Sequence, residues 1–294
     1  MKVFVLGATG YIGGSVAAGL MAAGHQVLGT ARTPERARAL EARGITATVA
    51  SFDDEAVLTR LAKEADAVIN AASADERRPV EVLIAALKGT GKRFIHTSGS
   101  SIVSTDTGGE LATPVYDEDS PFDSAPEKVA RNALDRRVLD AAKEGIHTNV
   151  ICPCLIYGQG LGLNPDSVQL PVLTKHARET GTARYIGKGE NVWSNVHIED
   201  LVDLYLLVLD RAPAGTFFFA ENAEANFRDM VGAIGKRFNL PTGSLPVSEA
   251  EALWGAEMAR LGLASNSRVR AKRARALGWK PHRPSVFDVL AGTK

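Results

Sequence analysis

The first residues that could do chemistry form a glycine-rich turn near the start of the chain. An apolar run, residues 3–6, precedes this turn, and a helix-like segment, residues 15–23, follows it. Glycines allow a tight turn and close approach of the backbone, and a helix N-terminus presents unpaired amides to negative charge. The pattern therefore predicts a cradle for the pyrophosphate of a dinucleotide. The predicted contacts are Gly7, Thr9, Gly10, Tyr11, Ile12 and Gly13.

The end of the next apolar run indicates which dinucleotide the chain binds. Residues 26–30 form this run, and Arg32 and Thr33 follow it, about 20 residues after the glycine turn, where a ribose-reading residue belongs. An acidic residue there would accept hydrogen bonds from a ribose 2′-hydroxyl and repel a 2′-phosphate, whereas a guanidinium matches phosphate geometry. We therefore expect NADP(H) to be preferred over NAD(H). The alternative is that Arg32 is an exposed arginine at the start of a loop.

Apolar strands alternate with helical segments through the first half of the chain, which predicts an α/β fold with a doubly wound parallel sheet. Further strands are expected at residues 46–49, 67–72, 92–98 and 148–152, and helices at 54–62, 79–87 and 129–143. Ligands of such sheets collect beyond the carboxyl ends of the strands. Further cofactor contacts are therefore expected at Asn70, Ala71, Ala72, Thr97 and Pro153.

The regular alternation of apolar and helical segments ends after Tyr157, where glycines and a proline predict a loop. We expect residues 1–157 to form a dinucleotide-binding Rossmann domain. Residues 158–294 are expected to form mainly a smaller α/β lobe that binds substrate, with about 192–220 returning to the first sheet. Further helices are expected at 201–209, 227–238, 248–260 and 267–277, and a strand at 216–220.

Composition favours a cytoplasmic protein that works on small molecules. The chain has 294 residues, is 45% hydrophobic, and has equal numbers of basic and acidic residues, 34 of each. Zero net charge disfavours nucleic acid and acidic membranes as partners, and no apolar run approaches the roughly 20 residues of a membrane helix. Cys152 and Cys154 are expected to be reduced thiols, and no metal site is expected.

Four segments carry a family resemblance: residues 7–13, 151–158, 195–201 and 277–281. With them, the chain resembles the short-chain dehydrogenase/reductase superfamily, in particular its extended and atypical members related to NAD-dependent epimerases and dehydratases. The resemblance covers nearly the whole chain. It implies a nicotinamide cofactor across the top of the sheet and a substrate between the sheet and the C-terminal lobe.

The catalytic positions that the resemblance implies have changed chemistry in this chain. Typical members carry a tyrosine and, four residues later, a lysine that lowers the pKa of the phenol, which passes a proton while hydride moves. Here the tyrosine position falls at Glu127 and the lysine position at Arg131. The usual serine falls at Gly99, with Ser98 and Ser100 as its neighbours.

Three interpretations of this change stay open. In the first, Glu127 is the acid or base, because burial can raise the pKa of a carboxyl, and Arg131 or Lys128 holds the cofactor ribose. In the second, the proton comes from Tyr116, Tyr157 or a water held by the two serines named above. In the third, the chain binds its cofactor without catalysis.

We predict an NADPH-dependent reductase of a small carbonyl or an activated double bond. The alternatives are an NAD(P)-binding sensor, or an epimerase or dehydratase acting on a sugar-like substrate by running hydride chemistry twice. In this family the helices at 79–87 and 129–143 often form a dimer seam, so a homodimer is a further hypothesis.

Overall fold

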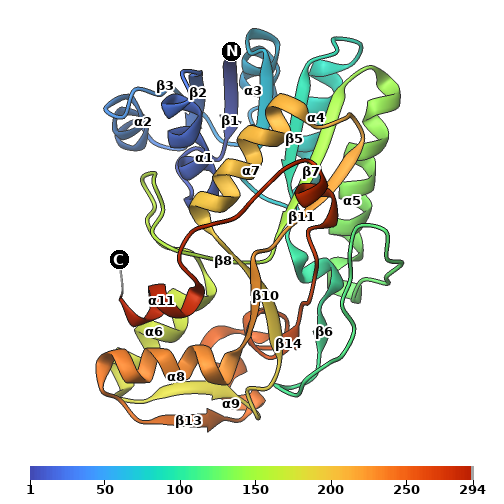
Figure 1. The fold of residues 1–294 in the computed structure, drawn as a ribbon. Coiled ribbons are helices and arrows are strands. Elements are labelled where there is room, and N and C mark those ends of the chain that lie inside the picture. Colours follow the sequence, from blue (N-terminus) through green and yellow to red (C-terminus); the bar gives the residue numbers. More distant parts are fainter. Residues whose placement is uncertain (293–294) are drawn as a thin grey trace.

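The computed structural model describes residues 1–292, and its centre is a seven-stranded sheet (Figure 1). The strand order is β11-β7-β5-β4-β1-β2-β3, and every neighbouring pair is parallel. The strands are β1 Lys2–Leu6, β2 Gln26–Ala31, β3 Thr46–Val49, β4 Ala67–Asn70, β5 Arg93–Thr97, β7 His147–Pro153 and β11 Thr216–Ala220. This confirms the predicted doubly wound α/β fold of Rossmann type.

Helices cover both faces of this sheet because successive side chains of a strand point to opposite faces. In β1, Val3 and Val5 pack into one core, and Phe4 and Leu6 pack into another. The first core is covered by α1 Tyr11–Ala22, α2 Pro34–Glu41 and α7 Ile198–Arg211. The second is covered by α3 Glu55–Glu64, α4 Arg77–Leu87 and α5 Val129–Asp140. Short 3₁₀ turns lie at Ser100–Val103, Pro126–Lys128 and Ala141–Glu144.

The C-terminal lobe, below the sheet in Figure 1, has a core of its own. Its strands are β8 Leu155–Tyr157, β10 Val192–His197 and β12 Ala223–Asn226 in one sheet, β9 Ala183–Ile186 with β13 Thr242–Leu245, and β6 Thr105–Asp106 with β14 Ser265–Asn266. Its helices are α6 Gln169–Thr180, α8 Phe227–Phe238, α9 Val247–Trp254 and α11 Val286–Ala291. The short helix α10 Lys272–Ala276 lies beside β11 of the central sheet.

The two helices predicted at 248–260 and 267–277 are wrong in extent. Helix α9 ends at Trp254 because Gly255 has a φ of 80°, and a π-helical turn, Met258–Leu263, follows. In the second segment only α10 is helical. Extended backbone precedes it, and the hydroxyl of Ser194 accepts a hydrogen bond from the amide of Val269 at 2.9 Å. Bonds to distant segments thus hold this backbone extended, since the amide of Arg270 likewise donates to the carbonyl of Tyr116 at 2.8 Å.

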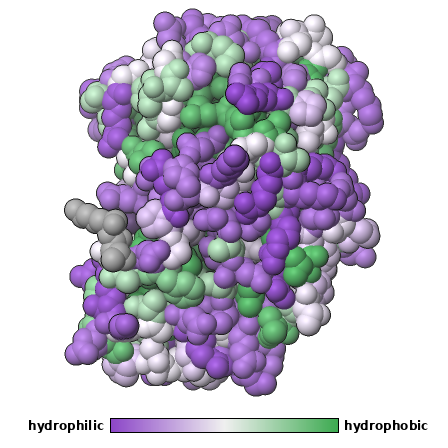
Figure 2. All heavy atoms as spheres, viewed as in Figure 1, coloured by the Kyte–Doolittle hydropathy of each residue, from purple (hydrophilic) through white to green (hydrophobic). Residues whose placement is uncertain are grey.

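The outer surface is mostly hydrophilic on the face seen in Figure 2, with hydrophobic side chains between polar ones over the layer that contains α1 and α7. Among residues 1–292, no helix is both long and apolar enough to cross a membrane. Cys152 and Cys154 are buried free thiols.

Candidate functional site

The glycine turn between β1 and α1 packs directly on the backbone that follows β4. Gly7 has a φ of 93°, and a side chain there would lie 2.6 Å from the carbonyl carbon of Ala71. A side chain at Gly13 would lie 2.3 Å from the carbonyl oxygen of Gly7. Gly10 caps α1 without a side-chain hydrogen bond to its first amides. The turn therefore requires glycine and leaves the helix N-terminus open to an anion.

A cavity of about 360 Å³ opens beside this turn, at the carboxyl ends of β1, β2 and β4. Of the predicted cofactor contacts, six line it, namely Gly7, Thr9, Gly10, Arg32, Ala71 and Ala72. Its lining also includes Thr30, Arg36, Phe52 and Asn164. No carboxylate is among the described residues of the lining. The place and size of the cavity fit the adenosine half of a dinucleotide cofactor.

The predicted contact Thr33 lies outside the lining of this cavity and caps α2. Its hydroxyl accepts a hydrogen bond from the amide of Arg36 at 3.3 Å. The cap begins a helix whose first turn brings Arg36 to the same cavity as Arg32. Arg36 was not among the contacts predicted from the sequence. Its position could have been predicted, because Thr33 and Pro34 mark the start of a helix whose first turn carries Arg36, four residues after Arg32.

Asn70 and Thr97, at the ends of β4 and β5, hold the backbone at this edge of the sheet. The side-chain oxygen of Asn70 accepts a hydrogen bond from the amide of Ala72 at 3.2 Å, and its nitrogen lies 3.1 Å from Nδ1 of His96. The hydroxyl of Thr97 lies 2.6 Å from that of Tyr205 on α7. Both side chains are buried and position the loops that line the cavity.

Three other predicted cofactor contacts do not line this cavity. Tyr11, at the start of α1, donates a hydrogen bond to the carbonyl of Gly158 at 2.8 Å, and burial raises the pKa of its phenol. Ile12 is half-buried against the core under α1. Pro153 is the last residue of β7 and pairs with Ala220.

Arg131, at the lysine position of the family, joins α5 to the segment that follows β4. Its guanidinium makes a bidentate ion pair with Asp75 and donates to the hydroxyl of Ser101 at 2.8 Å. Hydrogen bonding to Arg131 holds the pKa of Asp75 below its ordinary value. A side chain at Gly99 would lie 3.2 Å from Nη1 of Arg131, so the guanidinium stands beside the position of the usual serine.

Ser98 and Asp135 form a buried pair one turn further along α5. The hydroxyl of Ser98 donates a hydrogen bond to Oδ2 of Asp135 at 2.5 Å. The other carboxyl oxygen lies 3.7 Å from Nε2 of His96, and neither of these two atoms has a hydrogen-bond partner among the described residues. Burial raises the pKa of Asp135 to about 7 and lowers the pKa of His96 to about 4. Sequence reasoning missed Asp135, four residues after Arg131 on one helix face.

Glu127 and Lys128 lie in the 3₁₀ turn before α5 and have opposite environments. Glu127 is exposed, whereas Lys128 is buried. The ammonium of Lys128 lies 2.6 Å from Oε1 of Glu257, a residue of the C-terminal lobe. The structure therefore places a cation, and not the carboxylate of Glu127, in the interior beside α5.

Ser100 and Tyr157 are engaged in hydrogen bonds with distant segments. The hydroxyl of Ser267 donates to the carbonyl of Ser100 and lies 2.8 Å from its hydroxyl. The phenol of Tyr157 donates to the carbonyl of Pro284 at 3.0 Å, and burial raises its pKa. The structure thus gathers Ser98, Ser100 and Arg131 at one edge of the sheet and leaves Tyr157 bonded at the end of β8.

Residues 3–218 match the NAD dependent epimerase/dehydratase family. This match covers well over half of the chain and includes the glycine turn, the cavity beside it and the first turn of α5. The chain belongs to this family.

Relatives of the chain include one protein from a yeast and one from a bacterium. An uncharacterized protein of Schizosaccharomyces pombe is 29% identical, over 99% of this chain and 98% of that protein. A 2-alkyl-3-oxoalkanoate reductase of Stenotrophomonas maltophilia is 28% identical, over 76% of this chain and 71% of that protein. Family and relatives support an NAD(P)-dependent enzyme of the short-chain dehydrogenase/reductase superfamily, as the sequence resemblance implied.

Solved structures show the same fold. The dTDP-glucose 4,6-dehydratase of Bacillus anthracis, solved in complex with NAD, has a TM-score of 0.78 and 16% identity, over 100% of this chain and 95% of that one. At that identity the likeness concerns the fold alone.

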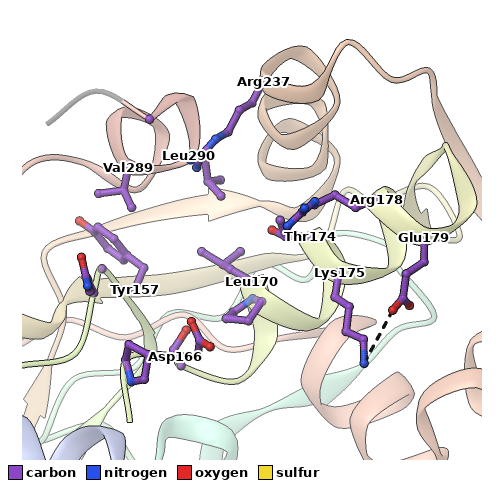
Figure 3. A pocket seen from close by; sticks show the side chains of 16 residues that line it. Tyr157, Asp166, Leu170, Thr174, Lys175, Arg178, Glu179, Arg237, Val289 and Leu290 are labelled. Carbon is purple, nitrogen blue, oxygen red and sulfur yellow. Dashed lines mark ion pairs between the residues drawn. The ribbon is translucent and has the colours of Figure 1, made fainter. Parts of the chain in front are cut away.

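A larger cavity, about 1030 Å³, lies in the C-terminal lobe of this family member between α6, α8 and α11 (Figure 3). Arg178 of α6 and Arg237 of α8 line it. Both guanidiniums lie over the ring of Phe238, at 5.7 and 5.3 Å from its centroid. Lys175 on its wall pairs with Glu179 at 3.8 Å.

The loop between β8 and α6 separates the two cavities. Asn164 lines the smaller cavity, and Pro165 and Asp166 line the larger one. The loop lies against α1 without intervening side chains, because a side chain at Gly162 would lie 2.6 Å from Cα of Gly14. Each of these two glycines is therefore required by the close approach of the other.

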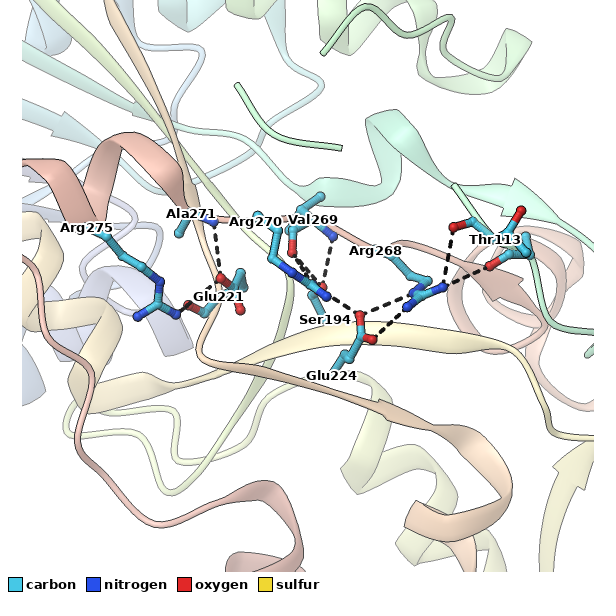
Figure 4. A network of polar contacts seen from close by, with 10 residues as sticks. Thr113, Ser194, Glu221, Glu224, Arg268, Val269, Arg270, Ala271 and Arg275 are labelled. Carbon is cyan, nitrogen blue, oxygen red and sulfur yellow. Dashed lines mark hydrogen bonds and ion pairs between the residues drawn. The ribbon is translucent and has the colours of Figure 1, made fainter. Parts of the chain in front are cut away.

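The basic residues near the C-terminus are bound in an ion-pair network and are not a free basic surface (Figure 4). Arg268 binds both carboxyl oxygens of Glu224, and Arg270 binds one of them. Arg275 binds the buried Glu221. These contacts fasten the C-terminal segment to β12 and to the end of β11.

Proposed function

We propose that the chain is an NADPH-dependent reductase of a small carbonyl or activated double bond. The observation that carries the cofactor preference is the pair of arginines, Arg32 and Arg36, on a cavity whose described lining has no carboxylate. Two guanidiniums favour a cofactor with a 2′-phosphate, and nothing on the described lining would accept hydrogen bonds from a 2′-hydroxyl as a carboxylate does.

The glycine turn would hold the pyrophosphate of this cofactor. Gly7, Thr9 and Gly10 line the cavity beside the N-terminus of α1, and a side chain at Gly7 would fill the space between the turn and Ala71. Asp75 and Arg131 would keep the segment after β4 in place against α5. When bound, the nicotinamide supplies a hydride to the substrate.

Ser98 is the proton donor that the geometry favours. When Asp135 is protonated, its carboxyl can donate to the Ser98 hydroxyl, which can then pass its own proton to a developing oxyanion. Burial raises the pKa of Asp135 to about 7, so the protonated form is available near neutral pH. Two of the other groups proposed from the sequence are less suited to this role. Glu127 is exposed, and the phenol of Tyr157 is bonded to a backbone carbonyl.

The similarity to the 2-alkyl-3-oxoalkanoate reductase of Stenotrophomonas maltophilia supports reduction of a carbonyl. The main alternative is a sensor that binds NADPH without turnover. An epimerase or dehydratase would retain NAD and show no net oxidation of the cofactor.

Cofactor titration tests the first half of the proposal. Replacing Arg32 or Arg36 with alanine should weaken NADPH binding roughly 10- to 150-fold, the usual loss of a hydrogen bond to a charged group, and leave NADH binding unchanged. Arg38→Ala is the matched control, because this side chain is 69% exposed and pairs with Glu35 on the outer side of α2. Equal losses for both cofactors would contradict the preference.

Turnover tests the second half. NADPH absorbance should decay with at least one member of a panel of ketones, 3-oxo acids and enones. Ser98→Ala should then lower kcat by roughly 10²- to 10⁴-fold without changing NADPH affinity, since general acid catalysis contributes about that much. Tight NADPH binding with no turnover across the panel would favour the sensor, and turnover without net NADPH oxidation would favour an epimerase.

A homodimer through α4 and α5 stays a prediction. The apolar residues Leu83, Ile84 and Leu87 of α4 are buried within the subunit, and Arg137 of α5 pairs with Glu81 between the two helices. A partner would therefore meet the outer residues of the two helices, of which Val129 is 55% exposed. Light scattering that gives the mass of one chain would contradict the dimer.

A further inference from the structure

Lys128 is a buried cation at a point where the two lobes meet. Its side chain is 5% exposed, and it directly precedes the first residue of α5. The ammonium lies 2.6 Å from Oε1 of Glu257, which belongs to the C-terminal lobe. A buried ammonium costs several kcal/mol unless it is paired, so this position requires a negatively charged partner.

Glu257 is a weak permanent partner for this cation. Its side chain is 73% exposed, and within residues 1–292 no other hydrogen bond or ion pair holds its carboxylate. It stands between the end of α9 and the π-helical turn, two residues after Gly255. Exposed long side chains lose entropy when fixed, and solvent screens their charge, so the carboxylate itself loses little when it turns into the solvent, provided that another anion then pairs the ammonium.

The neighbouring cation on α5 is balanced in a different way. Arg131 is held by both oxygens of Asp75 and also donates to Ser101. Its partners come from the same lobe and need not move for a ligand to enter from the C-terminal lobe. Lys128 is therefore the cation of this helix start whose counterion is easily replaced.

Lys128 lies near the carboxyl end of the central sheet. The first turn of α5 lies against the carboxyl end of β5, because Arg131 lies 3.2 Å from a side-chain position at Gly99. The cavity lined by Arg32 lies at the carboxyl ends of β1, β2 and β4 in the same sheet. Lys128 thus stands between the cofactor edge of the sheet and the C-terminal lobe.

We propose that the substrate carries a carboxylate, and that this carboxylate binds Lys128 in place of Glu257. The proposal rests on the reductase function proposed above, because it assigns a part of that substrate. Lys128 becomes a substrate-binding residue, and Glu257 becomes an internal competitor that keeps the ammonium paired until the substrate arrives. The substrate class is then oxo acids, and neutral ketones are poor substrates.

A binding experiment tests the site without turnover. Octanoate and octanamide are titrated by calorimetry into the protein saturated with NADPH. Octanoate should bind at least tenfold more tightly than octanamide. Lys128→Met should weaken octanoate binding roughly 10- to 150-fold, and Glu257→Gln should strengthen it several-fold. Lys188→Met is the matched control, because Lys188 pairs with Glu110 at 2.9 Å on the exposed surface.

Both variants are expected to fold. Lys128→Met leaves the carboxylate of Glu257 in solvent, where it needs no partner. Glu257→Gln leaves the buried ammonium without a counterion, so its melting temperature should fall, and octanoate should restore it by more than it raises that of the wild type.

Four results would overturn the proposal or separate it from the reductase function. Equal affinity for octanoate and octanamide overturns it, and so does weaker NADPH binding by Lys128→Met without octanoate, because Lys128 would then hold the cofactor. A turnover comparison uses 3-oxooctanoate and its methyl ester. Equal kcat/KM for the two overturns the carboxylate site and leaves the reductase standing. Octanoate binding that depends on Lys128, with no turnover of either compound, supports the site and contradicts the reductase.

Discussion

Replacing Asp135 with asparagine should change how the free energy of unfolding depends on pH. Burial raises the pKa of the Asp135 carboxyl from 3.8 to about 7, so the folded state takes up a proton that the unfolded state has lost. The stability from this group is therefore present below about pH 4 and is lost as pH rises through 7. The asparagine side chain keeps the acceptor for Ser98 and cannot ionise.

The size of the effect follows from the two pKa values. One pKa unit corresponds to 1.36 kcal/mol, and between pH 5 and 8 the unfolded carboxyl is ionised throughout while the folded one ionises only above about 7. The stability of the wild type should therefore fall by roughly 2 to 3 kcal/mol relative to that of Asp135→Asn over this range.

His96 changes the free energy of unfolding with pH in the opposite direction. Burial lowers its pKa from 6.5 to about 4, so the stability it contributes is complete above 6.5 and is lost as pH falls towards 4. In the wild type the two groups nearly cancel between pH 4 and 6.5. In Asp135→Asn the histidine acts alone, and stability should rise with pH over that interval.

Urea denaturation at pH 5, 6, 7 and 8 measures these differences. Asp140→Asn is the matched control, because this exposed residue of α5 pairs with Lys143, which holds its pKa below the range tested. A wild-type minus Asp135→Asn difference that is constant with pH would refute a raised pKa. A wild type that gains stability relative to the variant as pH rises would also refute it, because a raised carboxyl pKa requires the opposite slope.

Two further predictions concern the edge of the sheet where the cofactor would bind. Gly13→Ala should weaken NADPH binding at least tenfold in a fluorescence titration, because the new methyl would lie 2.3 Å from the carbonyl oxygen of Gly7, whereas Gly232→Ala, with nothing within 4 Å, should bind normally. Arg131→Met should lower the free energy of unfolding by about 1 to 3 kcal/mol in urea, since it removes charged hydrogen bonds to Asp75. Unchanged stability of Arg131→Met would show that this ion pair holds nothing in place.

Local patterns were enough to predict the central sheet. Most of its strands are apolar runs bounded by turn residues, and this signal needs no knowledge of distant segments. The prediction of a helix over residues 267–271 was wrong for the opposite reason. Its backbone is satisfied by Ser194 and by strand neighbours more than 70 residues away, so its own composition did not determine its conformation.

The candidate site divides in the same way. The glycine turn and Arg32 are local, and the sequence predicted them. Lys128 and Glu257 are 129 residues apart, and neither position alone indicates the ion pair. The environment of Glu127 could not be predicted because adjacent residues in a 3₁₀ turn point in different directions, and one buried lysine decides which of them faces the interior.

The approach of Gly14 to Gly162 gives the two cavities a common wall. The segment from Gly158 to Asp166 has the 360 Å³ cavity on one side and the 1030 Å³ cavity on the other, and its amide at Leu161 is anchored to the hydroxyl of Ser15 at 3.0 Å. Because this segment contacts the backbone of α1 directly, it cannot move independently of α1. Any movement that widens one chamber must narrow the other or carry the glycine turn with it.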